Sequence, residues 1–192
     1  MMTRHSSAVA LAAVLCACQV ADRGASVSPA KYGLGTAATQ AEIAAFNTDV
    51  SPSGEGLPAG RGDATRGAVL FQAQCASCHG ANGEGIASNP PLVGREPREG
   101  FPFGNDPKLI RTVGNYWPEA TTIFDYIRRT MPLSAPGSLS DDDVYSLTAH
   151  LLVANEILPA GASLDSASLV AVRMPAHDRF VPDDRRGGST VR

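Results

Sequence analysis

This chain of 192 residues has only four cysteines and no long apolar run, and each of these two shortages excludes a class of protein. No stretch approaches the roughly 18 consecutive apolar residues that a membrane-spanning helix needs. The formal net charge is −3 and 18% of the residues are charged, so we predict no nucleic-acid partner. Glycine and proline are plentiful instead, with 19 and 14 residues, which favours long loops between a few helices.

The first residues are typical of an export signal. A short basic region with Arg4 precedes the apolar run AVALAAVLCAC, as in a bacterial signal peptide. The tetrapeptide LCAC then fits the cleavage site of a lipoprotein, with Cys18 as the first mature residue. We predict a signal peptide of lipoprotein type over 1–17, a lipid anchor at Cys18 and a periplasmic location. The alternatives are an ordinary signal peptide cleaved nearby and an uncleaved anchor.

The remaining cysteines, Cys75 and Cys78, lie in the string CASCHG. A single pair cannot build a disulfide scaffold, and a four-ligand zinc site would need a second pair that the sequence does not offer. A thioredoxin-like motif would need alternating strands and helices, whereas these flanks indicate a helix and a glycine-rich loop. The pattern Cys-x-x-Cys-His is the attachment signal of haem c. Two thiols bond the two vinyl groups, and His79 is placed to bind the iron from one face.

The residues before this motif predict a helix that is capped by Asp63 and runs to about residue 74. Gly67 and Phe71 are four residues apart and therefore share a face of this helix. The pattern resembles the first helix of class I c-type cytochromes, where a glycine lets the last helix cross closely and an aromatic residue packs beside it. The resemblance implies an all-α class I cytochrome c fold, with three to five helices around one covalently bound haem and irregular N- and C-terminal extensions.

The string NPPLVG after the motif resembles the P-x-L-x-G loop of the same family. The resemblance implies that the Pro90 carbonyl accepts the Nδ1–H of His79, which orients the ring as a ligand. It also implies that Leu92 packs on the haem face. A second proline, Pro91, leaves open a shift of this register by one residue.

Four residues are candidates for the second axial ligand: Met131, Met174, His150 and His177. Met131 stands in RRTMPLSAPGSL, between one helix and the last one, where the class I family places its methionine ligand. A thioether suits the low-spin iron of an electron carrier, and we predict Met131 as the ligand. His150 is expected to pack at the helix crossing and His177 to be solvated. An open sixth position and ligation by Met174 are the alternatives.

Two more helices are expected after the haem loop. Ser140 and Asp143 form a capping box before the apolar stripe of the last helix, and Thr122 is expected to cap a helix that ends near residue 130. Trp117 precedes that helix, and its indole N–H is a candidate donor to a haem propionate. Further candidate donors are Tyr116, Arg95 and Arg98. The alternative is that the aromatic residues are core and the arginines are solvated.

Longer strings carry a closer resemblance, above all TVGNYWPEATTIFDYIRRTMPLSAPGSLSDDDVYSLTAHLL. Over residues 31–184 the chain resembles the cytochrome c subunit of bacterial Sox-type sulfite/sulfane dehydrogenases. The resemblance implies a molybdopterin subunit as electron donor and a downstream cytochrome or oxidase as acceptor. His150 and Phe46 depart from the tyrosine and tryptophan usual in that family, and a second haem motif is missing.

We therefore divide the chain into the signal peptide 1–17, an N-terminal extension 18–60, a cytochrome c domain 61–158 and a C-terminal extension 159–192 with a disordered end. The first extension should contain a short helix with a Thr39–Glu42 capping box, and both are expected to contact a partner. Arg128 and Arg129 are expected to steer that partner electrostatically. The predicted function is electron transfer without catalysis by the chain itself. A general periplasmic electron carrier and a haem enzyme with an open sixth site are the alternatives.

Overall fold

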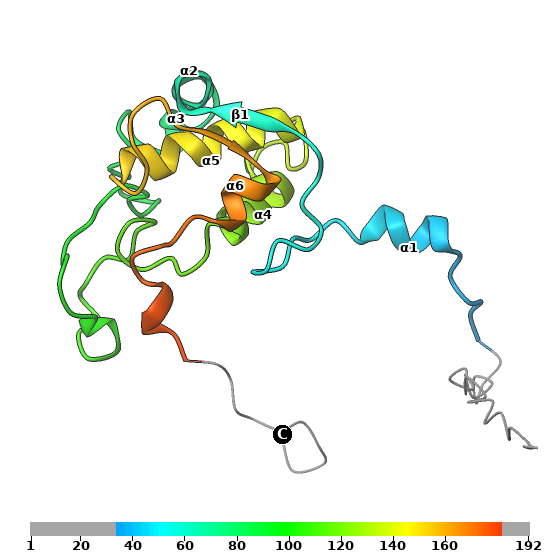
Figure 1. Cartoon of the computed structure of the whole chain (residues 1–192), viewed down its shortest axis with the longest axis horizontal. Helices are drawn as coiled ribbons and strands as arrows, with labels where there is room; N and C mark the ends of the chain where they lie inside the picture. Colours follow the sequence, from blue (N-terminus) through cyan, green and yellow to red (C-terminus); the bar gives the residue numbers. More distant parts are fainter. Residues whose placement is uncertain (1–33, 182–192) are drawn as a thin grey trace, which may run out of the picture. The chain divides into compact units, whose positions relative to one another are not determined.

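The computed structural model describes residues 34–181, so the predicted signal peptide and Cys18 lie outside the described residues. Its contacts separate residues 1–39 from residues 40–192. The described part of the first unit, residues 34–39, is exposed and contains no helix or strand. The second unit carries all helices and strands of the described range (Figure 1). Between residues 34 and 181, no helix is long and apolar enough to cross a membrane.

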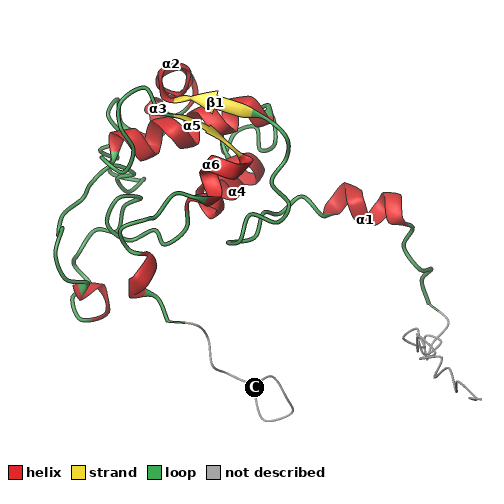
Figure 2. Ribbon diagram, in the orientation of Figure 1, coloured by secondary structure: helices red, strands yellow, loops and turns green. Residues whose placement is uncertain are grey.

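Three helices form the body of this unit, as Figure 2 shows in red: α2 (Ala64–Gln74), α4 (Ala120–Thr130) and α5 (Asp141–Ala154). Four-residue α3 (Ala76–His79) follows α2 at once and contains Cys78 and His79. Shorter elements complete the unit: α1 (Gln40–Phe46), α6 (Ser166–Val170) and the 3-10 turns η1 (Pro102–Gly104) and η2 (His177–Arg179). The mostly helical architecture agrees with the expected all-α class.

The caps of α2 and α5 are those that the sequence predicts. The Asp63 carboxylate accepts the N–H of Arg66 at 2.9 Å, and the Ser140 hydroxyl accepts the N–H of Asp143 at 3.2 Å. The expected cap of α4 is wrong, because α4 begins at Ala120, two residues before Thr122. The Thr122 hydroxyl donates instead to the carbonyl of Glu119 at 2.9 Å.

Helices α2 and α5 cross at Gly67, as expected from the sequence. A Cβ at position 67 would overlap the carbonyl of Ser146 and lie 2.7 Å from the Cβ of His150. The Phe71 ring is 2% exposed and packs on the His150 ring at a centroid distance of 5.1 Å. His150 therefore fills the crossing as a packing residue, and burial lowers the pKa of its imidazole.

A two-stranded sheet joins both ends of the cytochrome domain, which the sequence analysis did not predict. Strand β1 (Arg61–Asp63) pairs antiparallel with β2 (Ser163–Asp165), with Gly62 opposite Leu164. Figure 1 shows β1 lying over α5, and a Cβ at Gly62 would lie 2.6 Å from the carbonyl oxygen of Asp142. Because β2 pairs with β1, this close packing of β1 on α5 also makes residues 163–165 part of the folded unit.

The predicted boundary at residue 158 does not separate the described residues into a domain and an irregular extension. Beyond it, Leu164, Leu169 and Met174 are all buried in the same core as α4 and α5. Leu169 is fully buried and lies on α6, whose N-cap Asp165 forms a capping box with Ser168. Burying each such side chain contributes roughly 1.5–3 kcal/mol, so residues 159–176 are part of the folded unit.

The N-terminal segment joins the same core at Val50. This residue is 4% exposed, and its N–H donates to the Asp125 carboxylate of α4 at 2.8 Å. The Tyr145 hydroxyl donates to the carbonyl of Pro58 at 2.8 Å, so residues 50–60 follow the surface of α4 and α5. Residues 34–49, by contrast, are all exposed, and α1 lies within them.

Candidate functional site

A cavity of about 420 Å³ opens between α2, α4, α5 and the loops that connect them. That size lies within the roughly 300–1,000 Å³ of ligand-binding pockets. None of its lining residues is Asp, Glu, Lys or Arg. The wall comprises Phe71, Gln74, Cys75, Ser77, Cys78, His79, Asn89, Leu92, Ile127, Met131, Pro132, Leu133, Ser134, Leu139, Leu147 and Leu151.

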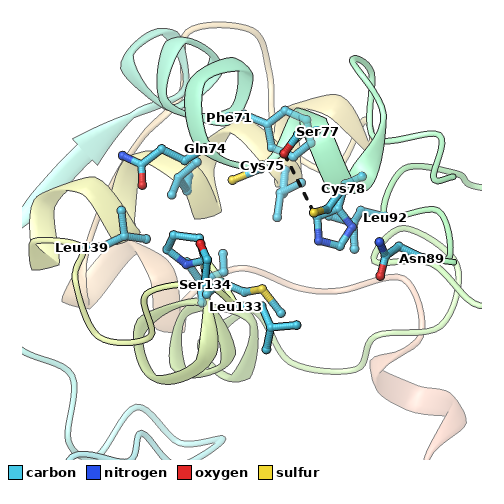
Figure 3. Close-up of a pocket in the computed structure, with 16 residues that line it drawn as sticks. Phe71, Gln74, Cys75, Ser77, Cys78, Asn89, Leu92, Leu133, Ser134 and Leu139 are labelled. Carbon is cyan, nitrogen blue, oxygen red and sulfur yellow. Dashed lines mark hydrogen bonds between the residues drawn. The ribbon is translucent and has the colours of Figure 1, made fainter.

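Cys75 and Cys78 lie together on one side of this cavity, and Leu133 and Ser134 lie across from them (Figure 3). Both thiols are free of disulfide bonding. Burial, aided by the neighbouring Cys78, raises the pKa of the Cys75 thiol to about 11. The hydroxyl of Ser77 donates to the sulfur of Cys78 at 3.9 Å. Two unpaired sulfurs on one wall match the needs of a group held by two thioether bonds.

The His79 imidazole lies on the same wall at the end of α3. Burial lowers its pKa, which favours the neutral ring that binds metal ions. Its Nδ1 is buried and has no hydrogen-bond partner within residues 34–181. The expected bond to the Pro90 carbonyl is therefore not formed, and Pro90 is exposed and outside the cavity wall. Leu92 does line the cavity, as expected.

Of the four candidates for the second axial ligand, only Met131 lines the cavity. It directly follows α4, and its N–H donates to the carbonyl of Ile127 at 3.0 Å. Met174 is 2% exposed and belongs to the hydrophobic core. His177 is not simply solvated, because its Nδ1 lies 2.9 Å from a carboxylate oxygen of Glu119.

The predicted propionate donors lie outside the cavity wall. The indole N–H of Trp117 donates to the Thr122 hydroxyl at 2.8 Å, and its ring packs edge-on against Tyr126. Tyr116 stacks on Phe101 at a centroid distance of 5.5 Å. These aromatic residues therefore serve packing within the protein.

The two arginines among those donors are held at the C-terminal end of α5. Arg95 donates to the carbonyl of Asn155 at 3.2 Å, and Arg98 pairs with the Glu156 carboxylate at 3.0 Å. Arg98 also pairs with Glu96 at 3.0 Å. These bonds hold both guanidinium groups against the protein and outside the cavity wall, although the buried Nε of Arg95 has no hydrogen-bond partner within residues 34–181.

Arg128 and Arg129, expected as a steering patch, are compensated by acidic neighbours. Arg128 pairs with Asp141 at 2.8 Å and donates to the carbonyl of Thr48 at 2.9 Å. Arg129 pairs with Asp125 on the same helix. Ion pairs of this kind leave little net positive field beside the cavity, so the two residues anchor the chain and do not form a free basic patch.

The residues present fit a covalently bound haem. The cavity combines two free thiols, an imidazole and a thioether in a wall that is otherwise mostly apolar, and a porphyrin needs such a wall. Sequence reasoning had identified the helix stripe that includes Leu147 and Leu151 but not its part in the cavity. It missed Leu133 and Leu139, although Leu139 directly precedes the helix cap Ser140, where apolar residues often pack.

One solved structure contains a chain that is similar to this protein. The crystal structure of the sulfane dehydrogenase SoxCD from Paracoccus pantotrophus contains a chain that matches with a TM-score of 0.70 and 41% identity. The match covers 81% of this chain and 74% of that chain.

Two relatives match over a shorter region. A thiosulfate dehydrogenase from Allochromatium vinosum is 32% identical over 90 residues, and one from Stutzerimonas stutzeri is 31% identical over 99 residues. The matches cover 47% and 49% of this chain but only 31% and 28% of the relatives. The chain thus spans less than a third of the length of these proteins.

The sequence model of the family described as "Cytochrome C oxidase, cbb3-type, subunit III" matches residues 62–151. This range begins in β1 and ends within α5, so it contains every residue of the cavity wall. The identity to the SoxCD chain, over so large a share of both chains, places this protein in the family of class I c-type cytochromes, which transfer electrons through covalently bound haem c.

Proposed function

We propose that this cytochrome is the electron-accepting subunit of a molybdenum-dependent dehydrogenase that oxidises a sulfur compound. The observation that carries the proposal is the 41% identity to a chain of the sulfane dehydrogenase SoxCD, over 81% of the present chain. The donor would be a molybdopterin sulfite/sulfane dehydrogenase subunit, and the acceptor a downstream cytochrome or oxidase.

In this proposal Cys75 and Cys78 would hold the haem, and His79 and Met131 would bind its iron. Haem c, when bound, supplies a one-electron couple between donor and acceptor. His79 would bind the iron as a neutral imidazole, which its lowered pKa favours. Met131 would complete the coordination from the opposite loop, and a soft thioether raises the reduction potential relative to a second histidine.

The uncharged wall of the cavity supports a subunit over a general carrier. Transient electron carriers rely on charged rims to attract their partners, whereas permanent interfaces are more apolar. The rim here includes Leu133, which is 78% exposed, together with Ser134 and Pro132. Because Arg128 and Arg129 are both ion-paired, their charges add little long-range steering.

Helix α1 supports a permanent partner as well. It has only seven residues, none of them buried, and Ile43 and Phe46 are 46% and 88% exposed. These two side chains are three positions apart and share a face. A helix this short is marginal by itself in water, so a partner surface that covers this face would stabilise it.

The test is stopped-flow reduction of the purified cytochrome by the purified molybdenum subunit, with sulfite or a sulfane sulfur compound as donor. Substrate-dependent reduction on the millisecond to second scale would support the proposal. Absence of reduction by any sulfur donor, with intact haem and partner, would leave only a general periplasmic electron carrier.

The relatives named thiosulfate dehydrogenase favour one further candidate, a haem protein that acts on a sulfur compound directly. Such activity needs an open sixth position. A sulfur-to-iron charge-transfer band in the oxidised spectrum would argue against it, because that band requires a bound thioether. Thiosulfate-dependent reduction of the isolated cytochrome would favour it.

We also propose a periplasmic location, with a lipid anchor at Cys18. The proposal rests on the basic and apolar segments of residues 1–17 and the LCAC string. Cys18→Ser should move the protein from washed membranes to the soluble periplasmic fraction. An unchanged membrane fraction would contradict the anchor but not the export.

A further inference from the structure

Asn155 caps the C-terminal end of α5 and is fully buried. Its side-chain oxygen accepts the N–H of Gly94 at 2.9 Å. Its side-chain nitrogen donates to the carbonyls of Leu151 at 2.8 Å and Leu92 at 3.3 Å. Both ends of the buried amide are therefore satisfied, and they connect α5 with a loop that is far away in the sequence.

That loop forms one wall of the haem cavity through Leu92. Residues 112 and 113 hold its other side: the carbonyl of Leu92 accepts the N–H of Val113 at 3.1 Å, and the carbonyl of Gly94 accepts the Thr112 hydroxyl at 2.5 Å. The backbone of Leu92 and Gly94 is thus bonded both to α5 and to residues 112–113.

The packing around this amide leaves no room for adjustment. A Cβ at Gly114 would overlap the side-chain oxygen of Asn155 and lie 2.5 Å from the carbonyl oxygen of Gly94. Without the Asn155 side chain the buried N–H of Gly94 would lose its acceptor, which is costly for a group shielded from water, whereas the carbonyl of Leu92 would keep its bond from the N–H of Val113. The loop therefore has one strongly preferred position relative to α5.

We propose that Asn155 is a positioning residue for electron transfer: it holds the Leu92–Gly94 loop against α5 and thereby sets the reduction potential of the haem. The proposal requires haem in the cavity but not the molybdenum partner, so it and the proposed dehydrogenase role can fail separately.

The physical reason is solvent access. Leu92 and Leu151 both line the cavity, and Asn155 bonds to the backbone of both. The oxidised haem carries one more positive charge than the reduced haem, so water that reaches it favours the oxidised state. A loop that is released from α5 would admit water and lower the potential.

The test compares Asn155→Leu with the wild-type holoprotein. Leucine has the same branching at Cγ but larger terminal groups, and it neither donates nor accepts hydrogen bonds. We expect faster hydrogen exchange of the Gly94 amide in the reduced protein, by tenfold or more, because its acceptor is lost. We also expect a lower potential, corresponding to a roughly threefold or larger shift in the electron-exchange equilibrium with a reference couple.

Thr148→Val is the matched control. Thr148 is also fully buried on α5, but its hydroxyl donates only within the helix, to the carbonyl of Val144 at 2.7 Å. It should lose stability without a change in potential or in Gly94 exchange. If Asn155→Leu lowers stability but leaves both readouts at wild-type values, Asn155 is merely structural and the proposal is overturned.

A second variant covers the case in which Asn155→Leu does not fold. Thr112→Val removes the bond to the Gly94 carbonyl from the other side of the loop. It should lower the potential in the same direction, because the same loop is loosened. Where both variants fold, their effects on the potential should be non-additive, since they act on one shared element. An unchanged potential in Thr112→Val would count against the proposal.

Discussion

Gly67 of α2 and Ser146 of α5 approach so closely that a Cβ at position 67 would lie 2.6 Å from the carbonyl carbon of Ser146. Backbone therefore packs directly on backbone at this crossing. The ring of Phe71, one turn further along α2, faces the cavity. The crossing thus sets the distance between α2, which leads into the Cys75–His79 segment, and α5, which supplies Leu147 and Leu151 to the cavity wall.

Gly67→Ala is expected to separate these helices. The added methyl group has no flexible neighbour to displace, so the free energy of unfolding should fall by ~3 kcal/mol or more. The measurement is urea unfolding of the holoprotein. Gly104→Ala is the control, because nothing lies within 4 Å of a Cβ there, and its effect should stay within about 0.5 kcal/mol. Equal stability of the two variants would contradict the close crossing.

Cys75→Ala and Cys78→Ala should each leave haem attached through one sulfur, because each thiol bonds one vinyl group. The remaining free vinyl group should shift the pyridine haemochrome band to longer wavelength. Ser77→Ala, between the two cysteines, should retain the wild-type spectrum. If both cysteine variants kept the wild-type band and showed as much haem staining after denaturation as the wild type, covalent attachment at this motif would be wrong.

Met131→Ala should abolish the sulfur-to-iron charge-transfer band and lower the reduction potential, because the iron loses a soft ligand. Met174→Leu is the matched control, since Met174 is 2% exposed in the core and away from the cavity. This volume-conserving change should cost less than about 1.5 kcal/mol and leave the band intact. Loss of the band in Met174→Leu alone would transfer the axial role to that residue.

The Asp125 carboxylate accepts the N–H of Val50 and so holds the N-terminal segment on α4. The free energy of unfolding should therefore depend on pH in the acid range. Burial alone would raise the pKa of Asp125, but hydrogen bonds from Arg129 and the Val50 N–H outweigh it, and the pKa lies below its usual value. The stabilisation should be complete above the unfolded-state pKa of about 3.9 and be lost as pH falls through the lower native value.

Asp125→Asn should accordingly be less stable at pH 7 and should lose less stability than the wild type as pH falls below 4. Urea unfolding of the holoprotein at a series of pH values measures this. Asp178→Asn is the control, because Asp178 pairs with Arg173 in an exposed position where solvent screens the charges. A wild-type acid profile in Asp125→Asn would remove the assigned role of this carboxylate.

The exposed face of α1 should matter for assembly with the proposed partner. Ile43→Ser together with Phe46→Ser should reduce co-purification with the molybdenum subunit, while the haem spectrum and the isolated stability stay unchanged. Val69→Ser removes a comparably exposed apolar side chain, 68% exposed on α2, and should bind the partner normally. Equal co-purification of all variants would show that α1 is not part of the interface, and self-association of the wild type alone would indicate a second copy as the occupant.

The sequence by itself determined the local features. The C-x-x-C-H spacing is a local chemical requirement, and Asp63 and Ser140 cap helices through bonds that span only three residues. The four-residue spacing of Gly67 and Phe71 follows from helix geometry alone. The two caps and the shared helix face of Gly67 and Phe71 were predicted correctly, because none of them requires knowledge of what lies opposite in space.

The tertiary structure decided the features that depend on distant partners. Strand β1 pairs with β2 about a hundred positions later, and both strands are only three residues long, too short for a periodic pattern. The indole of Trp117 donates to the Thr122 hydroxyl, and Arg128 pairs with Asp141. The Asp125 carboxylate accepts the backbone N–H of Val50. Which acceptor an indole or guanidinium meets depends on how the chain packs, because several acceptors are available in sequence. In the sequence Asn155 is an ordinary polar residue at the end of a helix. Its bonds to the Leu92–Gly94 loop exist only because the fold places Leu92 and Gly94 beside it.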